Sequence, residues 1–200
     1  RLSSGFFMKG LQEEGMVDYP EPFTNLRCQG MVLKDGGKMS KSVGNVVSPE
    51  EIVGKYGADT ARLFILFAAP PEKDLEWSDH GVEGSYRFLQ RVWNIVGKYE
   101  DIQTEEKGKL SSDEFALRRK LHQTIKKVTE DLDGKFAFNT AISAIMELVN
   151  DMYRFIEAHD TIEASLSGEL VRNLLILLAP FGPQRAEALW AGAGARVEGR

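Results

Sequence analysis

The sequence predicts a mainly α-helical fold, in which a short mixed α/β segment precedes an antiparallel α-helical bundle. From Ser78 onward, apolar residues recur every three or four positions, which is the spacing of one face of a helix. The stretches between these patterns are short, so consecutive helices are expected to pack antiparallel. Before Ser78, the run Lys34-Asp35-Gly36-Gly37 is typical of a tight turn between two strands. The predicted boundaries are 1–77 for the α/β part, 78–191 for the bundle and 192–200 for a disordered or truncated tail.

The first part is predicted to open with a helix and to continue into a hairpin. Phe6, Phe7 and Leu11 lie at helical spacing, and Gly15 is expected to end that helix. The segment LRCQGMVL at 26–33 is short and partly apolar, which makes it a candidate strand. The Asp-Gly-Gly run after it contains residues that tolerate positive φ, so the chain is expected to turn back on itself there.

Two short helices are predicted to follow the hairpin. Ser48 is expected to be the N-cap of the first helix, with Pro49 at the first helical position and Glu51 completing a capping box. A glycine ends this helix after Tyr56. The second helix is predicted over Asp59–Phe67, because two prolines follow it closely.

Five helices are predicted for the bundle. A charged, glycine-containing linker over 100–110 separates the first from the second, where Ser111 and Glu114 form another capping box. The third begins at Asn139, the fourth covers Leu166–Ala179, and the fifth begins at Pro183. The residues expected to face the core are Val82, Tyr86, Leu89, Trp93 and Val96, then Leu117, Leu121, Ile125, Val128 and Leu132, and then Ile142, Ile145, Met146, Val149 and Met152.

Composition and charge exclude several classes of protein. The formal net charge is −5, whereas a dedicated nucleic-acid binder usually has a basic balance, so any contact with RNA is expected to be local. The single cysteine, Cys28, excludes an internal disulfide framework. The three histidines are scattered without the spacing of metal ligands, so no metal site is predicted. The longest apolar run, 174–181, is too short to span a membrane, and no leader opens the chain, so the cytoplasm is the expected location.

One segment, Lys38-Met39-Ser40-Lys41-Ser42, carries groups suited to an anion. Two ammonium groups three residues apart follow a glycine turn, and two hydroxyl groups alternate with them. Lysine is a mobile point charge with three hydrogen-bond donors, which suits phosphate oxygens whose charge changes during a reaction. Gly36 and Gly37 would let the loop close on a triphosphate and then release pyrophosphate. A solvated basic turn is the alternative interpretation of the same residues.

The segment lies within the stretch GMVLKDGGKMSKSVGNVVSPEEIVGKYGADTARLF. This stretch resembles the class I aminoacyl-tRNA synthetases, for which KMSKS is the second signature. The resemblance extends from about Phe6 to Trp190. It implies that residues 1–77 are the end of a Rossmann-type catalytic domain with its KMSKS loop, and that the bundle is of the anticodon-binding type.

Further runs are LEWSDHGVEG at 75–84, YRFLQRVW at 86–93, QGMVL at 29–33 and NTAISAIMEL at 139–148. These runs resemble the leucine-specific members of the family. The isoleucine and valine enzymes tend to show a different sequence in place of the run at 75–84. The resemblance implies a ligase that activates leucine with ATP and transfers it to tRNA-Leu. A synthetase for valine, isoleucine or methionine is the alternative within the family.

The resemblance also implies roles for particular residues. Lys41 would be catalytic by stabilising the transition state of activation, and Lys38 would assist. Gly44 and Asn45 would fix the exit of the loop. The phosphates of ATP, which brings Mg²⁺, would be held by Lys38, Met39, Ser40, Lys41 and Ser42. Phosphates of tRNA would contact the bundle at Arg87, Arg91, Arg118, Arg119 and Lys126. A solvated basic face beside the many acidic residues is the alternative interpretation of these five.

The sequence departs from the family pattern in several places. The HIGH signature is absent from these 200 residues, so activation of leucine is expected to need a HIGH-bearing catalytic half, fused or separate. The chain begins within a helical pattern and is interpreted as part of a longer protein. No leucine-specific insertion separates Leu33 from Lys38, and Gln184 stands where family members often have histidine, which weakens a tRNA contact there. Two further interpretations stay open, namely a non-catalytic tRNA-binding subunit of a split synthetase and a structural bundle with a vestigial loop.

Overall fold

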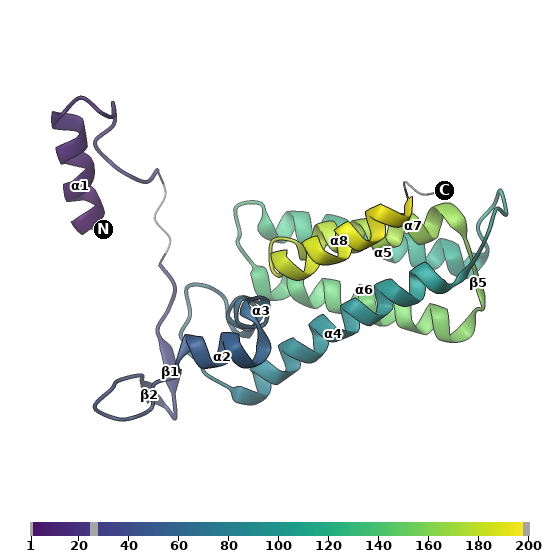
Figure 1. Cartoon of the computed structure of the whole chain (residues 1–200), viewed down its shortest axis with the longest axis horizontal. Helices are drawn as coiled ribbons and strands as arrows, with labels where there is room; N and C mark the ends of the chain where they lie inside the picture. The colour runs from purple at the N-terminus through teal and green to yellow at the C-terminus, as the bar shows by residue number, and fades with distance from the viewer. Residues whose placement is uncertain (1, 25–27, 198–200) are drawn as a thin grey trace.

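The computed structural model describes residues 2–24 and 28–197, and this part of the chain is mainly helical. Figure 1 shows a body of long helices in the second half of the chain, with the β1–β2 hairpin beyond one end of it. The predicted first helix is α1 (Leu2–Glu13). Among the described residues, no helix is both long enough and apolar enough to cross a membrane.

The first part of the chain contains a small three-stranded sheet. β1 (Val32–Lys34) pairs antiparallel with β2 (Gly37–Lys38) and parallel with β3 (Leu75–Glu76), in the order β2-β1-β3. Between β2 and β3 come α2 (Pro49–Tyr56) and α3 (Ala58–Ala68), close to their predicted bounds. A minor core is formed by Phe64, Leu75 and Val82.

The strand predicted over 26–33 is largely wrong, because β1 begins only at Val32. Residues 26 and 27 of that range lie outside the described residues. The backbone before β1 is held close to the segment that precedes β3, since the Gly30 N–H donates to the carbonyl oxygen of Pro71 at 2.8 Å. A Cβ at Gly30 would collide with the carbonyl oxygen of Lys73, so only glycine permits this approach.

The two predicted capping boxes have different outcomes. At the start of α2, the Ser48 hydroxyl donates to Glu50 Oε2 at 2.6 Å and makes no capping bond, so the box with Glu51 is wrong. The hydroxyl is oriented towards the Glu50 carboxylate, and its oxygen accepts no bond from the first turn of α2. Ahead of the second long helix, Ser111 Oγ accepts from the Glu114 N–H at 3.2 Å, and the Glu114 carboxylate accepts from the Ser111 N–H at 2.7 Å. This second box is confirmed.

In the part of the chain that the structure describes, five long helices make up the second half. They are α4 (Asp79–Asp101), α5 (Ser112–Leu132), α6 (Phe138–Ala158), α7 (Ala164–Leu178) and α8 (Pro183–Val197). Helices α5 and α6 run antiparallel, because Asp113 meets His159 at 3.1 Å and Lys120 meets Glu147 at 2.7 Å as the two helices proceed in opposite directions. The main core lies between these helices and includes most of the apolar residues predicted to face inward.

Trp93 is the clearest exception among the predicted core residues. Its side chain is 42% exposed, although Leu89 and Val96 on the same helical stripe are buried. The guanidinium carbon of Arg185 lies 5.6 Å from the centroid of a Trp93 ring. The facing part of α8 therefore offers a cation to the indole rather than an apolar surface, which is a favourable but exposed arrangement.

Two segments differ from the predicted secondary structure. Within the expected linker, β4 (Gln103–Glu105) pairs parallel with β5 (Thr161–Glu163). All three β4 side chains are exposed, so no alternation of apolar and polar residues identified this strand. At the other end, α8 continues to Val197, so residues 192–197 of the expected disordered tail are helical. Residues 198–200 lie outside the described part of the chain.

Asp59 joins the first part of the chain to the last helix. It lies in the first turn of α3, is only 4% exposed, and its Oδ2 accepts from the backbone N–H of Arg185 at 2.7 Å. The N-cap position of α8 is Gly182, which has no side chain, so Asp59 caps this helix from another element. Arg62, also on α3, donates to the carbonyl oxygen of Pro180 at 3.1 Å.

Candidate functional site

The β1–β2 hairpin positions the predicted lysine loop. Its turn residues Asp35 and Gly36 have φ of 57° and 74°, the pair of positive values that defines a type I′ turn. The pairing of Leu33 with Lys38 confirms the predicted hairpin. Lys38 is therefore the last residue of β2, and the loop that contains Lys41 begins where the sheet ends.

The side chain of Asn45 braces this loop. Its Oδ1 accepts from the backbone N–H of Ser40 at 2.9 Å. Its Nδ2 donates to the carbonyl oxygens of Lys34, at 3.1 Å, and Lys38, at 3.4 Å. One half-buried amide thus connects both strands of the hairpin with the loop that follows them.

The loop itself is a compact turn. The backbone N–H groups of Val43 and Gly44 donate to the carbonyl oxygen of Ser40 at 3.2 and 3.1 Å. The hydroxyl oxygens of Ser40 and Ser42 are 2.6 Å apart, and the Ser42 N–H donates to Ser40 Oγ at 3.2 Å. Lys41 lies inside this turn, so its backbone is held on both sides by bonds to Ser40.

Lys38 and Lys41 are both exposed, and neither makes an ion pair among the described residues. Other lysines of the chain are engaged, for example Lys107 with Glu114 and Lys127 with Asp131. The loop therefore presents two positive charges that no described carboxylate neutralises. Together with the two serine hydroxyls, this arrangement can bind phosphate oxygens.

Residues around β3 hold the hairpin from its other side. Glu76 Oε1 accepts from the Gly36 N–H, in the hairpin turn, at 3.1 Å. The Trp77 N–H donates to the carbonyl oxygen of Leu33 at 2.7 Å, and the indole N–H of Trp77 donates to Asp79 Oδ1 at 2.9 Å. Glu76 was not among the residues predicted from the sequence, because 40 residues separate it from Gly36 and no spacing rule connects them.

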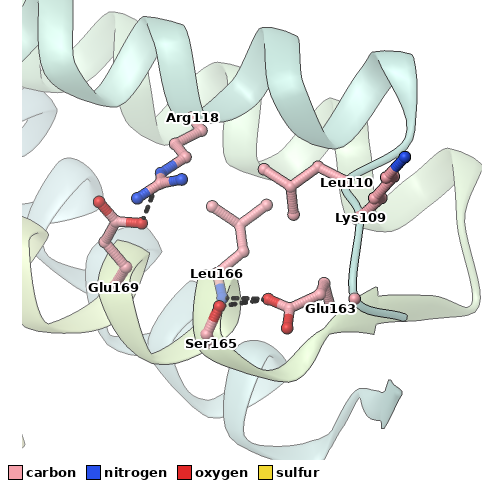
Figure 2. Close-up of a pocket in the computed structure, with 8 residues that line it drawn as sticks. Lys109, Leu110, Arg118, Glu163, Ser165, Leu166 and Glu169 are labelled. Atoms are coloured by element: carbon pink, nitrogen blue, oxygen red, sulfur yellow. Dashed lines mark hydrogen bonds and ion pairs between the residues drawn. The ribbon is translucent and has the colours of Figure 1, made fainter. Parts of the chain in front are cut away.

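The predicted basic residues of α5 mostly have partners. Arg118 Nε lies 2.9 Å from Glu169 Oε2, beside a pocket of about 180 Å³ that also contains Glu163 (Figure 2). The Arg119 guanidinium covers a neighbouring phenylalanine ring, with 5.1 Å from its carbon to the centroid. Lys126 is 3.8 Å from a glutamate one turn further on. Carboxylates at the pocket counter the charge of Arg118, so this face is not a continuous basic surface.

The predicted basic residues of α4 are separate from those of α5. Arg91 lines a groove of about 580 Å³ between α4 and α6, and its Nη2 donates to Asn150 Oδ1 at 2.9 Å. Its guanidinium carbon is 4.9 Å from the centroid of Tyr153, and Arg154 contributes a second cation to the groove. Arg87 is exposed one turn earlier on α4. The five predicted residues therefore fall into two groups, with Arg87 and Arg91 on α4 and the other three on α5.

No group of three or more His, Cys, Asp or Glu side chains within the described ranges is arranged to hold a metal ion. The histidines of the bundle contact acids in pairs instead. His122 Nε2 is 3.0 Å from Glu169 Oε1, and His159 Nε2 is 3.1 Å from Asp113 Oδ2. Cys28 is exposed and forms no disulfide.

Two family models match the chain on either side of residue 79, where α4 begins. The model described as tRNA synthetases class I (I, L, M and V) matches residues 5–78, which contain the hairpin and the lysine loop. The model described as the anticodon-binding domain of tRNA ligase matches residues 114–199.

Individual relatives carry the name leucine–tRNA ligase. The chain is 52% identical over 192 residues to the protein of Methylobacillus flagellatus, and the aligned region covers 94% of the chain and 23% of that protein. It is 50% identical over 197 residues to the protein of Thermosipho melanesiensis, and the aligned region covers 96% of the chain and 24% of that protein. The chain therefore spans about a quarter of the length of these relatives.

Solved structures agree with these relatives. A LeuRS from Agrobacterium radiobacter, solved as a ternary complex with tRNA and LeuAMS, matches with a TM-score of 0.72 and 33% identity, over 94% of this chain and 25% of that one. A methionyl-tRNA synthetase of Mycobacterium tuberculosis in complex with methionyl-adenylate matches with a TM-score of 0.66 over 92% of this chain and 40% of that one. At 22% identity, the second match supports the fold alone.

Proposed function

The chain is a segment of the class I tRNA synthetase family whose relatives are leucine–tRNA ligases, and we propose that it supplies the phosphate-binding loop of an enzyme that joins leucine to tRNA-Leu. The observation that carries this proposal is the pair of exposed lysines, Lys38 and Lys41, on a turn braced by Asn45. The complete enzyme would contain this chain together with a catalytic half that carries the HIGH signature.

The proposed reaction has two steps. The leucine carboxylate attacks the α-phosphorus of ATP, and the bond to the β-phosphate breaks to release pyrophosphate and leave leucyl-adenylate. A terminal ribose hydroxyl of tRNA-Leu then attacks the activated carbonyl and displaces AMP. In the first step, negative charge grows on the departing pyrophosphate, and Lys38 and Lys41 stabilise that charge with the hydroxyls of Ser40 and Ser42. Mg²⁺ enters the site as part of the ATP substrate.

Leucine-dependent exchange of pyrophosphate into ATP tests this function. The measurement uses the longest natural protein that contains this chain, with valine, isoleucine and methionine in parallel. We expect exchange with leucine about 10–200-fold above valine, which lacks one methylene. Isoleucine and methionine, which differ from leucine in branching and in the thioether, should also give much less exchange than leucine. Exchange with another amino acid would instead assign a different member of the family. No exchange with any of them, even after addition of a HIGH-bearing partner, would refute the catalytic role in favour of a tRNA-binding module.

We propose that the helical bundle docks on tRNA and that the protein acts in the cytoplasm. Of the two basic regions, the groove between α4 and α6 and the face of α5, the groove is the better supported. Arg91 lines this groove and Arg87 is exposed one turn earlier on α4, and neither makes an ion pair within the described residues. By contrast, Arg118 on α5 is paired with Glu169, and Arg154 at the groove is paired with Asp151. Arginine suits the phosphate backbone because its planar fork makes two parallel hydrogen bonds. Arg119 and Lys126 remain candidates with weaker support.

Replacing Arg91 with glutamine should raise the KM for tRNA about 5–10-fold, with little change in leucine-dependent exchange. The reason is that loss of one phosphate contact weakens binding without touching activation, and it also lowers the dependence of binding on salt by about one unit of slope. Aminoacylation at several salt concentrations measures both effects. Arg172→Gln, an exposed arginine on α7, is the matched control. An equal change in the two variants would show that only net charge matters.

A further inference from the structure

Glu76 occupies a position from which it can control the lysine loop without touching a substrate. The Gly36 N–H lies in the two-residue turn, outside the paired positions of β1 and β2, so the hairpin itself offers it no acceptor. Glu76 supplies that acceptor through Oε1 at 3.1 Å. A bond from an N–H to an ionised carboxylate is stronger than a bond to a neutral group.

The strand that carries Glu76 is firmly anchored. Leu75, its neighbour, is 2% exposed and belongs to the minor core. On the other side, the rings of Trp77 and Phe64 pack edge to face with centroids 5.1 Å apart. The parallel pairing of β3 with β1 places Glu76 opposite Leu33, two residues before the turn. The carboxylate therefore connects the glycine turn to a buried and well-packed part of the fold.

Glu76 and Asn45 hold the hairpin at two separate points. Asn45 connects the carbonyl oxygens of Lys34 and Lys38 with the Ser40 N–H, and Glu76 holds the tip at Gly36. Asn45 fixes the strands relative to the loop, and the pairing with β3 holds β1 as far as Leu33. The bond from Gly36 to Glu76 extends this attachment to the tip of the hairpin.

We propose that Glu76 is a positioning residue for the activation step, which sets where Lys38 and Lys41 stand relative to the phosphates of ATP. This inference rests on the proposed phosphate-binding role of the loop. A displacement of about 1 Å at a reacting centre can lower a rate by about 10²-fold, so the loss of one tether at the tip should cost about 10-fold.

The direction in which substitutions of Glu76 change ATP binding and the activation rate distinguishes a positioning role from simple charge repulsion. A carboxylate near a triphosphate disfavours its binding through charge repulsion. If Glu76 acted only as a nearby charge, both Glu76→Ala and Glu76→Gln would tighten ATP binding or raise the rate. If Glu76 positions the turn, Glu76→Ala lowers the rate while Glu76→Gln, whose amide oxygen still accepts from Gly36, stays near the unaltered protein.

The experiment measures single-turnover leucyl-adenylate formation in the complete protein. We expect Glu76→Ala to lower the rate constant at saturating ATP about 10-fold, with an unchanged KM for leucine and recovery in Glu76→Gln. In a Lys38→Ala, Lys41→Ala background, Glu76→Ala should have no further effect, because its action passes through the lysines. Hydrogen exchange at the Gly36 amide should accelerate in Glu76→Ala but not in Glu76→Gln.

Asp74→Ala is the matched control. Asp74 Oδ1 accepts from the Met31 N–H at 2.8 Å, which is the same kind of bond but to the residue just before β1, at the end of the strand away from the lysines. Equal losses in Asp74→Ala and Glu76→Ala would mean that any loosening of β1 is sufficient, and would overturn the specific role of Glu76. Loss with Lys41→Ala but none with Glu76→Ala would overturn it too, and would leave the function of the loop intact. No leucine-dependent activity in the unaltered protein would overturn both proposals.

Discussion

Replacing Lys41 with alanine in the complete protein is expected to lower the rate constant for leucyl-adenylate formation by about 10²–10³-fold, the usual loss for one group that stabilises developing charge in a transition state. The affinity for leucine should change far less, because the ammonium group is expected to face the phosphates. Single-turnover formation of adenylate, with ATP and leucine varied separately, measures the two effects. Lys41 is exposed and has no ion pair in the described part of the chain, so its removal leaves no carboxylate unpaired.

Lys73→Ala provides the comparison for Lys41→Ala. Lys73 is another exposed lysine, just before β3 and outside the loop, so its removal changes the net charge by the same amount. We expect adenylate formation within about twofold of the unaltered protein for this variant, because surface charges are strongly screened at physiological salt. An unchanged rate in Lys41→Ala would remove the loop from the mechanism. A similar fall in both variants would reduce its role to long-range attraction of ATP.

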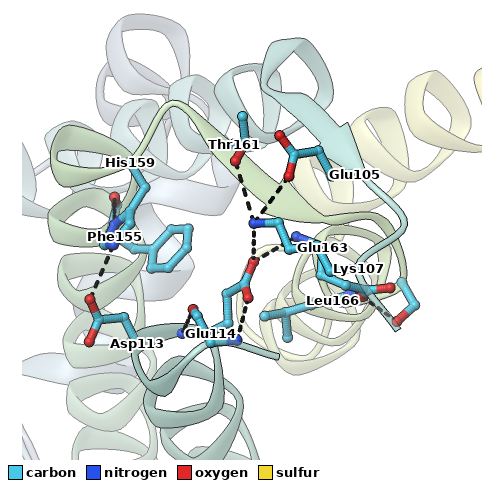
Figure 3. A network of polar contacts seen from close by, with 11 residues as sticks. Glu105, Lys107, Asp113, Glu114, Phe155, His159, Thr161, Glu163 and Leu166 are labelled. Atoms are coloured by element: carbon cyan, nitrogen blue, oxygen red, sulfur yellow. Dashed lines mark hydrogen bonds and ion pairs between the residues drawn. The ribbon is translucent and has the colours of Figure 1, made fainter. Parts of the chain in front are cut away.

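Glu114 is expected to give a large loss of stability for a charged residue of the bundle. Its side chain is 1% exposed, and its carboxylate accepts from the Ser111 N–H, the Glu163 N–H and the Lys107 ammonium (Figure 3). These bonds join the first turn of α5 to the connection that contains β4 and to the end of β5. Glu114→Ala should lower the free energy of unfolding by about 2–4 kcal/mol, because it leaves two buried amide donors without their acceptor. Lys107 keeps the carboxylate of Glu105, at 3.6 Å, as a partner.

Acid should remove the same stabilisation. Burial alone favours the neutral carboxyl, but the hydrogen bonds from Ser111, Glu163 and Lys107 outweigh it and lower the pKa of Glu114 from 4.5 to about 2. Because the folded state holds the carboxylate charged, the contribution is fully present above pH 4.5 and is lost as the pH falls towards 2. Its size is about 3 kcal/mol, from roughly 1.4 kcal/mol per pKa unit.

Urea unfolding of the unaltered protein and of Glu114→Gln, followed from pH 7 to pH 3, measures this contribution. The difference in free energy of unfolding between the two proteins should shrink below pH 4.5. Glu51→Gln, an exposed acid in the first turn of α2, is the control and should differ by less than about 0.5 kcal/mol at every pH. A gap between the unaltered protein and Glu114→Gln that does not depend on pH would show that packing, rather than charge, explains the loss.

The sequence was sufficient where a local pattern decides the structure. The apolar stripes located the long helices, because periodic burial on one face is the strongest signal a single sequence contains. The Asp-Gly turn located the hairpin for a similar reason, since few residues tolerate its positive φ. The capping rule succeeded at Ser111 and failed at Ser48, where a glutamate two residues on took the hydroxyl instead.

The sequence was insufficient where residues far apart in the chain meet. β4 and β5 are each three residues long and pair with a strand far away in the chain, so neither has a sequence pattern long enough to identify it. The role of Glu76 at the hairpin tip was invisible for the same reason. The basic residues of α5 suggested a surface for RNA, but contacts such as that of Arg118 with Glu169 on α7 could not be read from α5 alone. The phosphate and tRNA contacts themselves stay predictions.

The capping of α8 by Asp59 bears on how this chain can be divided for expression. The acceptor for the Arg185 N–H comes from a residue 126 positions earlier, before the start of the bundle, so the last helix completes its first turn only when α3 is present. A fragment cut at residue 78 would remove this acceptor and expose the apolar side chains of the bundle that α3 covers. The smallest unit that folds autonomously should therefore begin ahead of α3, near Gly57, and cross the junction between the two family matches.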